Sequence, residues 1–250
     1  MKVNIVSRDK RFSIVNEKLN DLGISSRIAD LNKIDPCDAL ILSPANELSD
    51  DELRSLLANV PTTTTILSGN AERIKKYTEC NVIDYTDDED FLVENARITA
   101  ESTISYLHTL TNESVKGKRI LVCGYGRIGK RLCEILYSLG AKVYVYTRRR
   151  HMRESISYDG YKTLTLDASS RIDIILNTTP SVIFEKELID NIPDTTYIVE
   201  LASAPGGFAC TERVNFANGL PGKILPISGA KAMAGAICGI LFSIRKDMDE

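Results

Sequence analysis

Three glycines, Gly124, Gly126 and Gly129, have the spacing that points most directly to chemistry, because they form a G-x-G-x-x-G pattern. The apolar residues at 120–123 predict a strand over 119–123 before them, and residues 127–139 follow with the spacing of a helix. In this setting the glycines permit a tight turn, close approach of a pyrophosphate, and close packing of helix on strand. The helix N-terminus also attracts phosphate. The pattern predicts a dinucleotide-binding turn; a plain glycine turn is the alternative.

The end of the next predicted strand, at 142–147, indicates which dinucleotide would bind. An acid at this point would bond the ribose 2′-hydroxyl of NAD and repel the 2′-phosphate of NADP. Here Thr147 leads instead into Arg148 and Arg149, and Arg148 lies about 20 residues past the turn, as the fingerprint requires. A guanidinium can hold a phosphate through two hydrogen bonds. We therefore expect NADP, with NAD as the second choice; a solvated basic loop is the alternative.

Other candidates follow predicted strands, because ligands of parallel sheets lie outside the carboxyl ends of the strands. The cofactor-binding residues expected in addition to the three glycines and residues 147–149 are Arg127, Ile128, Thr178, Thr179, Pro180 and Ser203. The substrate-binding residues expected at strand ends are Arg11, Ser43, Ser68 and Ser228. Arg11 is the preferred ligand for a carboxylate, and a surface cation is its alternative. The serines at 203 and 228 could equally be strand-end caps.

A long helix predicted over 91–110 carries the remaining candidates. Thr99 and Thr103 are four residues apart and share one face, which we expect to bind substrate. Glu101, on the same helix, is the only general base we name. Ser203 is the second residue we expect at the catalytic centre. The alternative is an ordinary helix surface with a solvated Glu101.

The elements that must position these residues alternate between strands and helices in two series. In the first series the strands are expected at 3–6, 24–28, 39–42, 64–67 and 82–85, and the helices at 12–22, 50–57 and 71–77. In the second the strands are expected at 119–123, 142–147, 163–166, 173–177, 196–201 and 223–226, and the helices at 127–139 and 230–244. This alternation predicts an α/β protein with two doubly wound parallel-sheet domains. We expect domains at 1–92 and 93–229, followed by a C-terminal helix over 230–250.

The composition excludes several classes of protein. The 250 residues include 31 basic and 34 acidic side chains and no basic tail, which disfavours nucleic-acid binding. The six cysteines form no C-x-x-C pair and no zinc-type spacing with histidine, so no metal site is expected. No signal-peptide pattern occurs, and no apolar run approaches the roughly 20 residues that span a bilayer. A reduced, cytoplasmic setting is expected.

Several motifs, in order, resemble the A subunits of dipicolinate synthase, an enzyme of spore dipicolinic acid formation. They are residues 99–103, the glycine turn, and residues 177–180, 201–207 and 219–222. The resemblance covers most of the chain from about residue 97 onward, and earlier residues match more loosely through Asp9 and Arg11. Ala204 departs from the pattern, since a member of that family has arginine there.

The resemblance implies oxidation of dihydrodipicolinate to dipicolinate with a nicotinamide cofactor, in the cytoplasm of the mother cell during sporulation. It also implies a partner, a flavoprotein-like B subunit, and we expect a homo-oligomer. The family's architecture is similar to that of the D-2-hydroxyacid dehydrogenases: an N-terminal flavodoxin-like substrate domain, an NAD(P)-binding Rossmann domain, and a last helix that returns toward the first domain.

The histidines set this chain apart from those dehydrogenases, which use a general acid–base histidine in a late loop. The chain has only His108 and His151, and neither stands in a late loop. Two further functions remain open, for two separate reasons. Ala204 leaves room for a dehydrogenase of another small carboxylate, and the lack of an evident acid–base residue leaves room for a non-catalytic dinucleotide-binding subunit.

Overall fold

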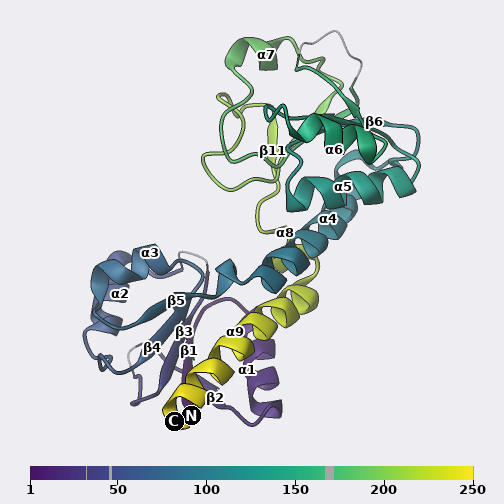
Figure 1. The fold of residues 1–250 in the computed structure, drawn as a ribbon. Helices are drawn as coiled ribbons and strands as arrows, with labels where there is room; N and C mark the ends of the chain where they lie inside the picture. The colour runs from purple at the N-terminus through teal and green to yellow at the C-terminus, as the bar shows by residue number, and fades with distance from the viewer. Residues whose placement is uncertain (32, 45–46, 167–171, 250) are drawn as a thin grey trace. The chain divides into compact units, whose positions relative to one another are not determined.

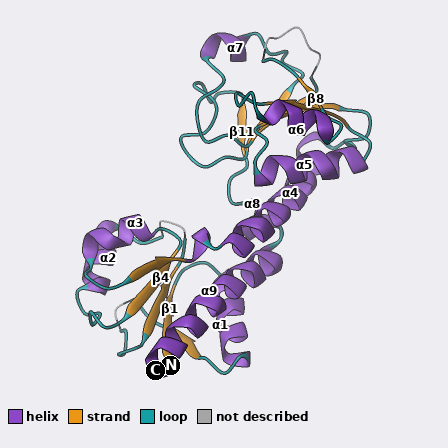
Figure 2. Cartoon of the chain, in the orientation of Figure 1, coloured by secondary structure: helices purple, strands orange, loops and turns teal. Residues whose placement is uncertain are grey.

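The computed structural model describes residues 1–31, 33–44, 47–166 and 172–249 and divides the chain into two compact units. The first unit comprises Met1–Asn95 together with Pro226–Glu250, and the second comprises Ala96–Leu225. Each unit is built around a parallel β-sheet with helices packed against it (Figures 1 and 2). The α/β fold class with two doubly wound parallel sheets is confirmed.

The sheet of the first unit has five parallel strands in the order β2-β1-β3-β4-β5. These strands are β1 (Lys2–Val6), β2 (Ser25–Ile28), β3 (Ala39–Leu42), β4 (Thr65–Ser68) and β5 (Val82–Asp84). The helices of this unit are α1 (Arg11–Asp21), α2 (Asp50–Leu57), α3 (Ala71–Ile74), the 3-10 turns η1 (Lys75–Tyr77) and η2 (Tyr85–Asp87), and α9 (Pro226–Asp249). The order 2-1-3-4-5 is that of flavodoxin-like sheets.

The last helix, α9, completes the core of the first unit although it comes from the other end of the chain. Its buried residues Met233 and Ile237 belong to the same apolar cluster as Phe12 and Val15 of α1, and the two helices run side by side (Figure 1). α9 begins at Pro226, earlier than expected. Proline suits a first helical turn because its fixed φ is helical and its missing N–H needs no partner there.

The length and composition of α9 also correct an expectation. The 21 residues Pro226–Lys246 are long and apolar enough to cross a membrane, contrary to our reading of the sequence. Isoleucine, leucine and phenylalanine supply most of this apolar character, but alanines and glycines stand between them, so the large side chains form no long continuous run. One face of the helix is part of a buried core, as in the core helices of soluble proteins, and the segment is weak evidence for a membrane span.

The sheet of the second unit has six parallel strands in the order β11-β10-β9-β6-β7-β8. These strands are β6 (Arg119–Cys123), β7 (Lys142–Tyr146), β8 (Lys162–Thr163), β9 (Ile174–Asn177), β10 (Tyr197–Glu200) and β11 (Val214–Phe216). The helices are α5 (Arg127–Ser138), α6 (Met152–Tyr158), α7 (Lys186–Asp190), α8 (Leu220–Ile224) and the later part of α4 (Glu89–Thr111). This is the strand order of a Rossmann fold, and it reverses direction between β6 and β9.

The end of the second unit differs from the sequence prediction. The strand expected at 223–226 is wrong: helix α8 extends to Ile224, helix α9 begins at Pro226, and β11 is the last strand. Gly219, with φ +68°, precedes α8 in the left-handed conformation, and Pro221 lies in its first turn. Both residues favour a turn followed by a helix rather than a strand.

Candidate functional site

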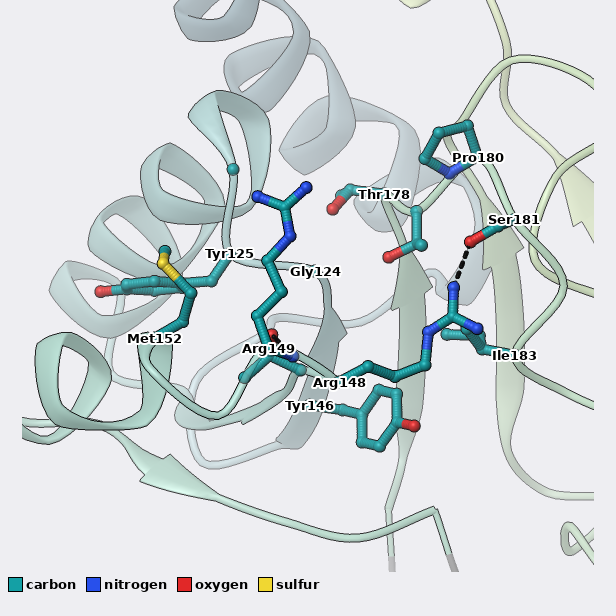
Figure 3. Close-up of a pocket in the computed structure, with 13 residues that line it drawn as sticks. Gly124, Tyr125, Tyr146, Arg148, Arg149, Met152, Thr178, Pro180, Ser181 and Ile183 are labelled. Atoms are coloured by element: carbon teal, nitrogen blue, oxygen red, sulfur yellow. Dashed lines mark hydrogen bonds between the residues drawn. The ribbon is translucent and has the colours of Figure 1, made fainter.

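A pocket of about 330 Å³ lies in the second unit, at the carboxyl ends of β6, β7 and β9 (Figure 3). Three loops and one residue of α6 form its walls. The lining residues are Gly124, Tyr125, Gly126, Tyr146, Thr147, Arg148, Arg149, Met152, Thr178, Thr179, Pro180, Ser181 and Ile183. The pocket therefore lies where the strand order reverses, which is the position at which open α/β sheets bind their ligands.

The three glycines of the turn have different structural roles. Gly124 has φ +101°, and a Cβ there would lie 2.5 Å from Oγ1 of Thr178. A Cβ at Gly129 would lie 2.2 Å from the carbonyl oxygen of Gly124, so α5 packs directly on the turn. At Gly126 a Cβ would meet no described atom within 4 Å. Gly124 and Gly129 thus make the turn compact, while Gly126 leaves open space at the pocket wall.

Helix α5 presents its N-terminus to this space. Gly126 is the N-cap, and among the described residues no side chain caps the helix. The amide of Lys130 donates to the carbonyl of Gly126 at 2.9 Å and forms the first turn. The first amides of a helix have no partner within the helix, and the helix dipole is positive at this end. This end of the pocket fits a pyrophosphate.

The end of β7 gives the pocket a positive charge. Arg148 and Arg149 are exposed and point in different directions, and Nη2 of Arg148 donates to Oγ of Ser181 on the loop after β9 (Figure 3). The amide of Arg149 donates to Oγ1 of Thr147 at 3.2 Å, which holds the loop. None of the described residues that line the pocket is acidic. A phosphate ester on this side would meet guanidinium donors and no carboxylate.

The loop after β9 is tied to the end of β6. The amide and the hydroxyl of Thr178 both donate to the carbonyl of Cys123, each at 2.9 Å. The hydroxyl of Thr179 reaches the same carbonyl at 3.4 Å. Both threonines therefore line the pocket in fixed positions, next to the glycine turn.

Tyr125, between the first two glycines, is a structural residue. Its ring is buried, and its hydroxyl donates to Oδ2 of Asp159 at 2.6 Å. Burial and the carboxylate of Asp159 raise the pKa of Tyr125 above its ordinary value. The phenol therefore stays protonated and anchors the turn rather than exchanging a proton with a ligand.

The pocket includes most, but not all, of the expected cofactor-binding residues. Those that do not line it are Arg127, Ile128, Gly129 and Ser203. The first three form the start of α5, whereas Ser203 is exposed on the loop after β10. The lining residues that sequence reasoning missed are Tyr125, Tyr146, Met152, Ser181 and Ile183. Ser181 directly follows the Thr-Thr-Pro strand end, which is the signal that could have identified it.

In the first unit, Arg11 is engaged by a neighbouring acid. Its Nε and Nη2 donate to Oδ2 of Asp9 at 2.8 and 2.6 Å, and its amide donates to Oδ1 at 2.9 Å. Burial works to raise the pKa of Asp9, but the hydrogen bonds and the charge of Arg11 outweigh it and hold this pKa below its ordinary value. A carboxylate ligand of Arg11 would have to compete with Asp9.

The two candidate serines of the first sheet meet in one small cavity. Ser43 and Ser68 line a space of about 20 Å³ together with Asn70 and Arg73, while Arg11 is not among its lining residues. The hydroxyl oxygen of Ser68 accepts the amide of Asn70 at 3.1 Å. A cavity of this size holds about one water molecule.

Ser228 lies elsewhere in the same unit. It is half-buried in the first turn of α9, not on a loop after a strand, because the strand expected before it is helical.

The candidates on α4 are largely satisfied within the helix. Thr99 and Thr103 are buried, and Oγ1 of Thr103 donates to the carbonyl of Thr99 at 2.7 Å. Glu101 is partly exposed, and Arg97, one turn earlier, donates to its carboxylate. The shared face of the two threonines is therefore buried, and the candidate base is held by a cation.

Comparison with known proteins agrees with this geometry. Residues 92–205 match the family model described as D-isomer specific 2-hydroxyacid dehydrogenase, NAD binding domain. The A subunit of dipicolinate synthase from Bacillus subtilis (strain 168) is 27% identical over 210 residues, which cover 80% of this chain and 71% of the relative. The resemblance to the A subunits of dipicolinate synthase is confirmed. The chain is an oxidoreductase with a domain for a nicotinamide dinucleotide.

Solved structures support the fold over nearly the whole chain. The A chain of dipicolinate synthase from Bacillus subtilis matches with a TM-score of 0.82 at 23% identity, covering 99% of this chain and 97% of that one. The A subunit of dipicolinate synthase from Bacillus halodurans matches with a TM-score of 0.78 at 22% identity, covering 96% and 97%.

Proposed function

We propose that this chain is a dipicolinate synthase A subunit that oxidises dihydrodipicolinate to dipicolinate with NADP. The observation that carries the proposal is the pocket at the glycine turn, which combines an uncapped helix N-terminus with Arg148 and Arg149. The name of the relative from Bacillus subtilis supplies the product, dipicolinate.

The preference for NADP follows from charge. The 2′-phosphate of NADP carries negative charge that a guanidinium can bind through two hydrogen bonds. Arg148 and Arg149 stand at the strand end where NAD-binding domains place an acid, and the described lining residues include no acid. Arg148 can exchange its bond to Ser181 for a phosphate oxygen.

The proposed reaction requires little acid–base catalysis by the protein. A dihydropyridine ring loses one hydride and one proton and becomes aromatic, and aromaticity supplies driving force. The dinucleotide, when bound, accepts the hydride. The protein must bind two carboxylates and let the proton leave, to Glu101 or to water. A missing acid–base histidine is compatible with this step.

The substrate contacts belong to the same proposal. Arg11 would bind one carboxylate by releasing Asp9, and Ser203 would act at the catalytic centre. The other proposed substrate-binding residues are Ser43, Ser68, Thr99, Thr103 and Ser228. We further propose that the chain forms a homo-oligomer, works with a flavoprotein-like B subunit, and acts in the cytoplasm of a sporulating mother cell.

One observation favours a second candidate, a dehydrogenase of another small carboxylate. Ala204 is exposed on the loop after β10, and it stands where a member of the resembled family has arginine, a cation that a dicarboxylate could use. A substrate with a single carboxylate would suit this loop as well.

An activity assay separates these proposals. Dihydrodipicolinate and NADP⁺ are supplied to the purified chain, with and without the flavoprotein-like partner, and reduction is followed at the nicotinamide absorbance. We expect reduction of NADP⁺, at least when both proteins are present. Tight NADP binding without turnover in either mixture would contradict the dipicolinate proposal, and would favour another carboxylate or a non-catalytic role.

A further inference from the structure

A buried carboxylate and a buried carboxamide meet beneath the loops of the second sheet. Glu200, the last residue of β10, is 1% exposed, and Asn177, the last residue of β9, is 0% exposed. Nδ2 of Asn177 donates to Oε1 and Oε2 of Glu200 at 2.8 and 3.0 Å. A buried carboxylate is costly unless donors surround it, so this pair needs a reason beyond packing.

Asn177 connects Glu200 to a residue that lines the pocket. Its Nδ2 donates to the carbonyl of Thr179 at 2.8 Å, and its Oδ1 accepts the amide of Thr179 at 3.1 Å. One side chain thus binds both polar backbone groups of a residue that lines the pocket. A carboxylate can only accept hydrogen bonds, so Glu200 keeps Nδ2 of the carboxamide directed toward itself and leaves Oδ1 to accept the amide of Thr179.

Glu200 also holds the loop that follows its own strand. Oε1 accepts the amide of Ala202 at 2.8 Å, and Oε2 accepts the amide of Gly207 at 2.6 Å. A Cβ at Gly206 would lie 2.7 Å from Oε2, and one at Gly207 would lie 2.4 Å from Nδ2 of Asn177. The two glycines are therefore needed for the loop to lie directly on this pair.

The loop then returns to the pocket. The carbonyl of Gly207 accepts the amides of Ile183 and Phe184, each at 2.9 Å. Ile183 lines the pocket. Glu200 is therefore connected to the pocket wall by two routes, one through Asn177 and Thr179 and one through Gly207 and Ile183.

We infer that Glu200 is the positioning residue that sets the dinucleotide-binding loop after β9 relative to the loop after β10. It does not line the pocket; it acts through Asn177 and Gly207. The inference deepens the proposed function, because it rests on a nicotinamide dinucleotide binding at the glycine turn. It does not depend on which dinucleotide binds or on the substrate.

Glutamine cannot replace Glu200, although it has nearly the same shape. An amide nitrogen in place of Oε1 would face the N–H of Ala202, and in place of Oε2 it would face the N–H of Gly207. Either orientation leaves one buried donor unsatisfied and releases one end of the loop. The Glu200→Gln variant is therefore the sharpest test, and Glu200→Ala removes all of these contacts.

The experiment measures dissociation constants of NADPH and NADH by nicotinamide fluorescence, on the full chain, beside the melting temperature. We expect Glu200→Gln to weaken binding of the preferred dinucleotide by about tenfold, since small displacements of a positioned loop have effects of this order or larger. Glu200→Ala is expected to weaken it further. Folded Glu200 variants that bind within about twofold of wild type would overturn the inference.

The matched control is Thr196, which directly precedes the other end of the same strand. Thr196 is 7% exposed, and its hydroxyl donates to the carbonyl of Ile172 at 2.7 Å. Thr196→Val also removes a buried hydrogen bond, so it should lower the melting temperature and leave the dissociation constants unchanged. An equal loss of affinity in Thr196→Val would mean that Glu200 acts only through stability, which also overturns the inference.

Hydrogen exchange on the wild-type chain gives a second test that does not require a variant to fold. The amides of Ala202 and Gly207 should exchange as slowly as those of β10, because Glu200 accepts both. Rapid exchange at both amides would contradict the inference. A wild type that prefers NADH would contradict the NADP proposal alone, and one that binds neither dinucleotide would overturn both.

Discussion

The carboxyl edges of the two sheets differ in how much space they leave and in how their charges are satisfied. In the second unit the edge opens into a pocket of about 330 Å³ with two exposed arginines. In the first unit the corresponding edge encloses a cavity of about 20 Å³. There Arg11 is paired with Asp9, and Arg8 donates to Glu52 and to the carbonyl of Glu47.

This difference separates two ways of preparing an anion site. The second unit does so with its backbone: glycines and a helix N-terminus leave space and donors before any ligand arrives. If Arg11 binds the substrate as proposed, the first unit does so with side chains whose charges neutralise one another in the absence of a ligand. An anion can enter the site of the second unit directly, whereas in the first unit it must displace a carboxylate from an arginine.

The largest expected effect comes from filling the open side of the glycine turn. In Gly126→Ala the new methyl group meets no described atom, so the chain should fold with little change in melting temperature. The methyl group would occupy ligand space, and we expect NADPH binding to weaken about 100-fold, as for a misplacement of about 1 Å. Fluorescence titration and thermal melting measure the two quantities.

Two other glycines provide controls for this substitution. Gly239→Ala adds a methyl group with equally open surroundings on α9, and it should leave NADPH binding unchanged. Gly129→Ala would press a Cβ against the carbonyl of Gly124 and should destabilise the second unit itself. Normal NADPH affinity in Gly126→Ala would show that this edge is not the dinucleotide site.

A smaller effect is expected from the charge at the end of β7. Arg148→Ala removes a guanidinium that we expect to bind the 2′-phosphate, so NADPH affinity should fall about tenfold, since a hydrogen bond to a charged group contributes about 1.5 kcal/mol or more. NADH affinity should stay the same. Arg150→Ala, at an exposed residue that does not line the pocket, is the matched control. Equal losses for NADPH and NADH would assign Arg148 to another part of the ligand.

The smallest effect is expected from the ion pair of the first unit. Folding holds the pKa of Asp9 below its ordinary 3.8, so the folded chain binds this proton less tightly than the unfolded chain. The pair therefore stabilises the fold above pH 3.8, and its contribution is lost as the pH falls through the lower, folded-state pKa. Asp9→Asn should lower the free energy of unfolding by about 1 kcal/mol at neutral pH. The decrease should become progressively smaller in acid, and urea unfolding measures it.

An exposed pair serves as the control for Asp9. Asp51 lies 3.7 Å from Arg54 and its side chain is 96% exposed, so Asp51→Asn should change stability little at any pH. The affinity for NADPH should be unchanged in both variants. A stability loss in Asp9→Asn that is independent of pH would show that the charge of Asp9 is not what stabilises this edge.

Backbone requirements explain what the sequence could predict. The turn was predictable because Gly124 and Gly129 have no room for a Cβ in its geometry, and such a requirement is visible in a single sequence. Arg148 was predictable from its place after a strand. Ser181 also follows a strand end, but its contact with Arg148 was not predictable, because it depends on β9 lying next to β6 in the folded sheet.

Short apolar segments explain where the prediction failed. The residues at 223–226 are compatible with a buried strand, but a run this short fits a helix equally well. Gly219 in its left-handed conformation and the prolines at 221 and 226 stand at the starts of α8 and α9 and favour helices there. β11 has only three residues, Val214–Phe216, and offers no periodicity to detect. Glu200 and Asn177 looked like ordinary strand ends because their pairing is visible only across two strands.

The central claim, that the pocket of the second unit binds NADP, is tested most directly by titrating the wild-type chain with NADPH and with NADH in a calorimeter at one salt concentration. The charges of Arg148 and Arg149 predict that NADPH binds at least about tenfold more tightly, from at least one additional charged hydrogen bond. NADH binding as tightly as NADPH, or more tightly, would contradict the account.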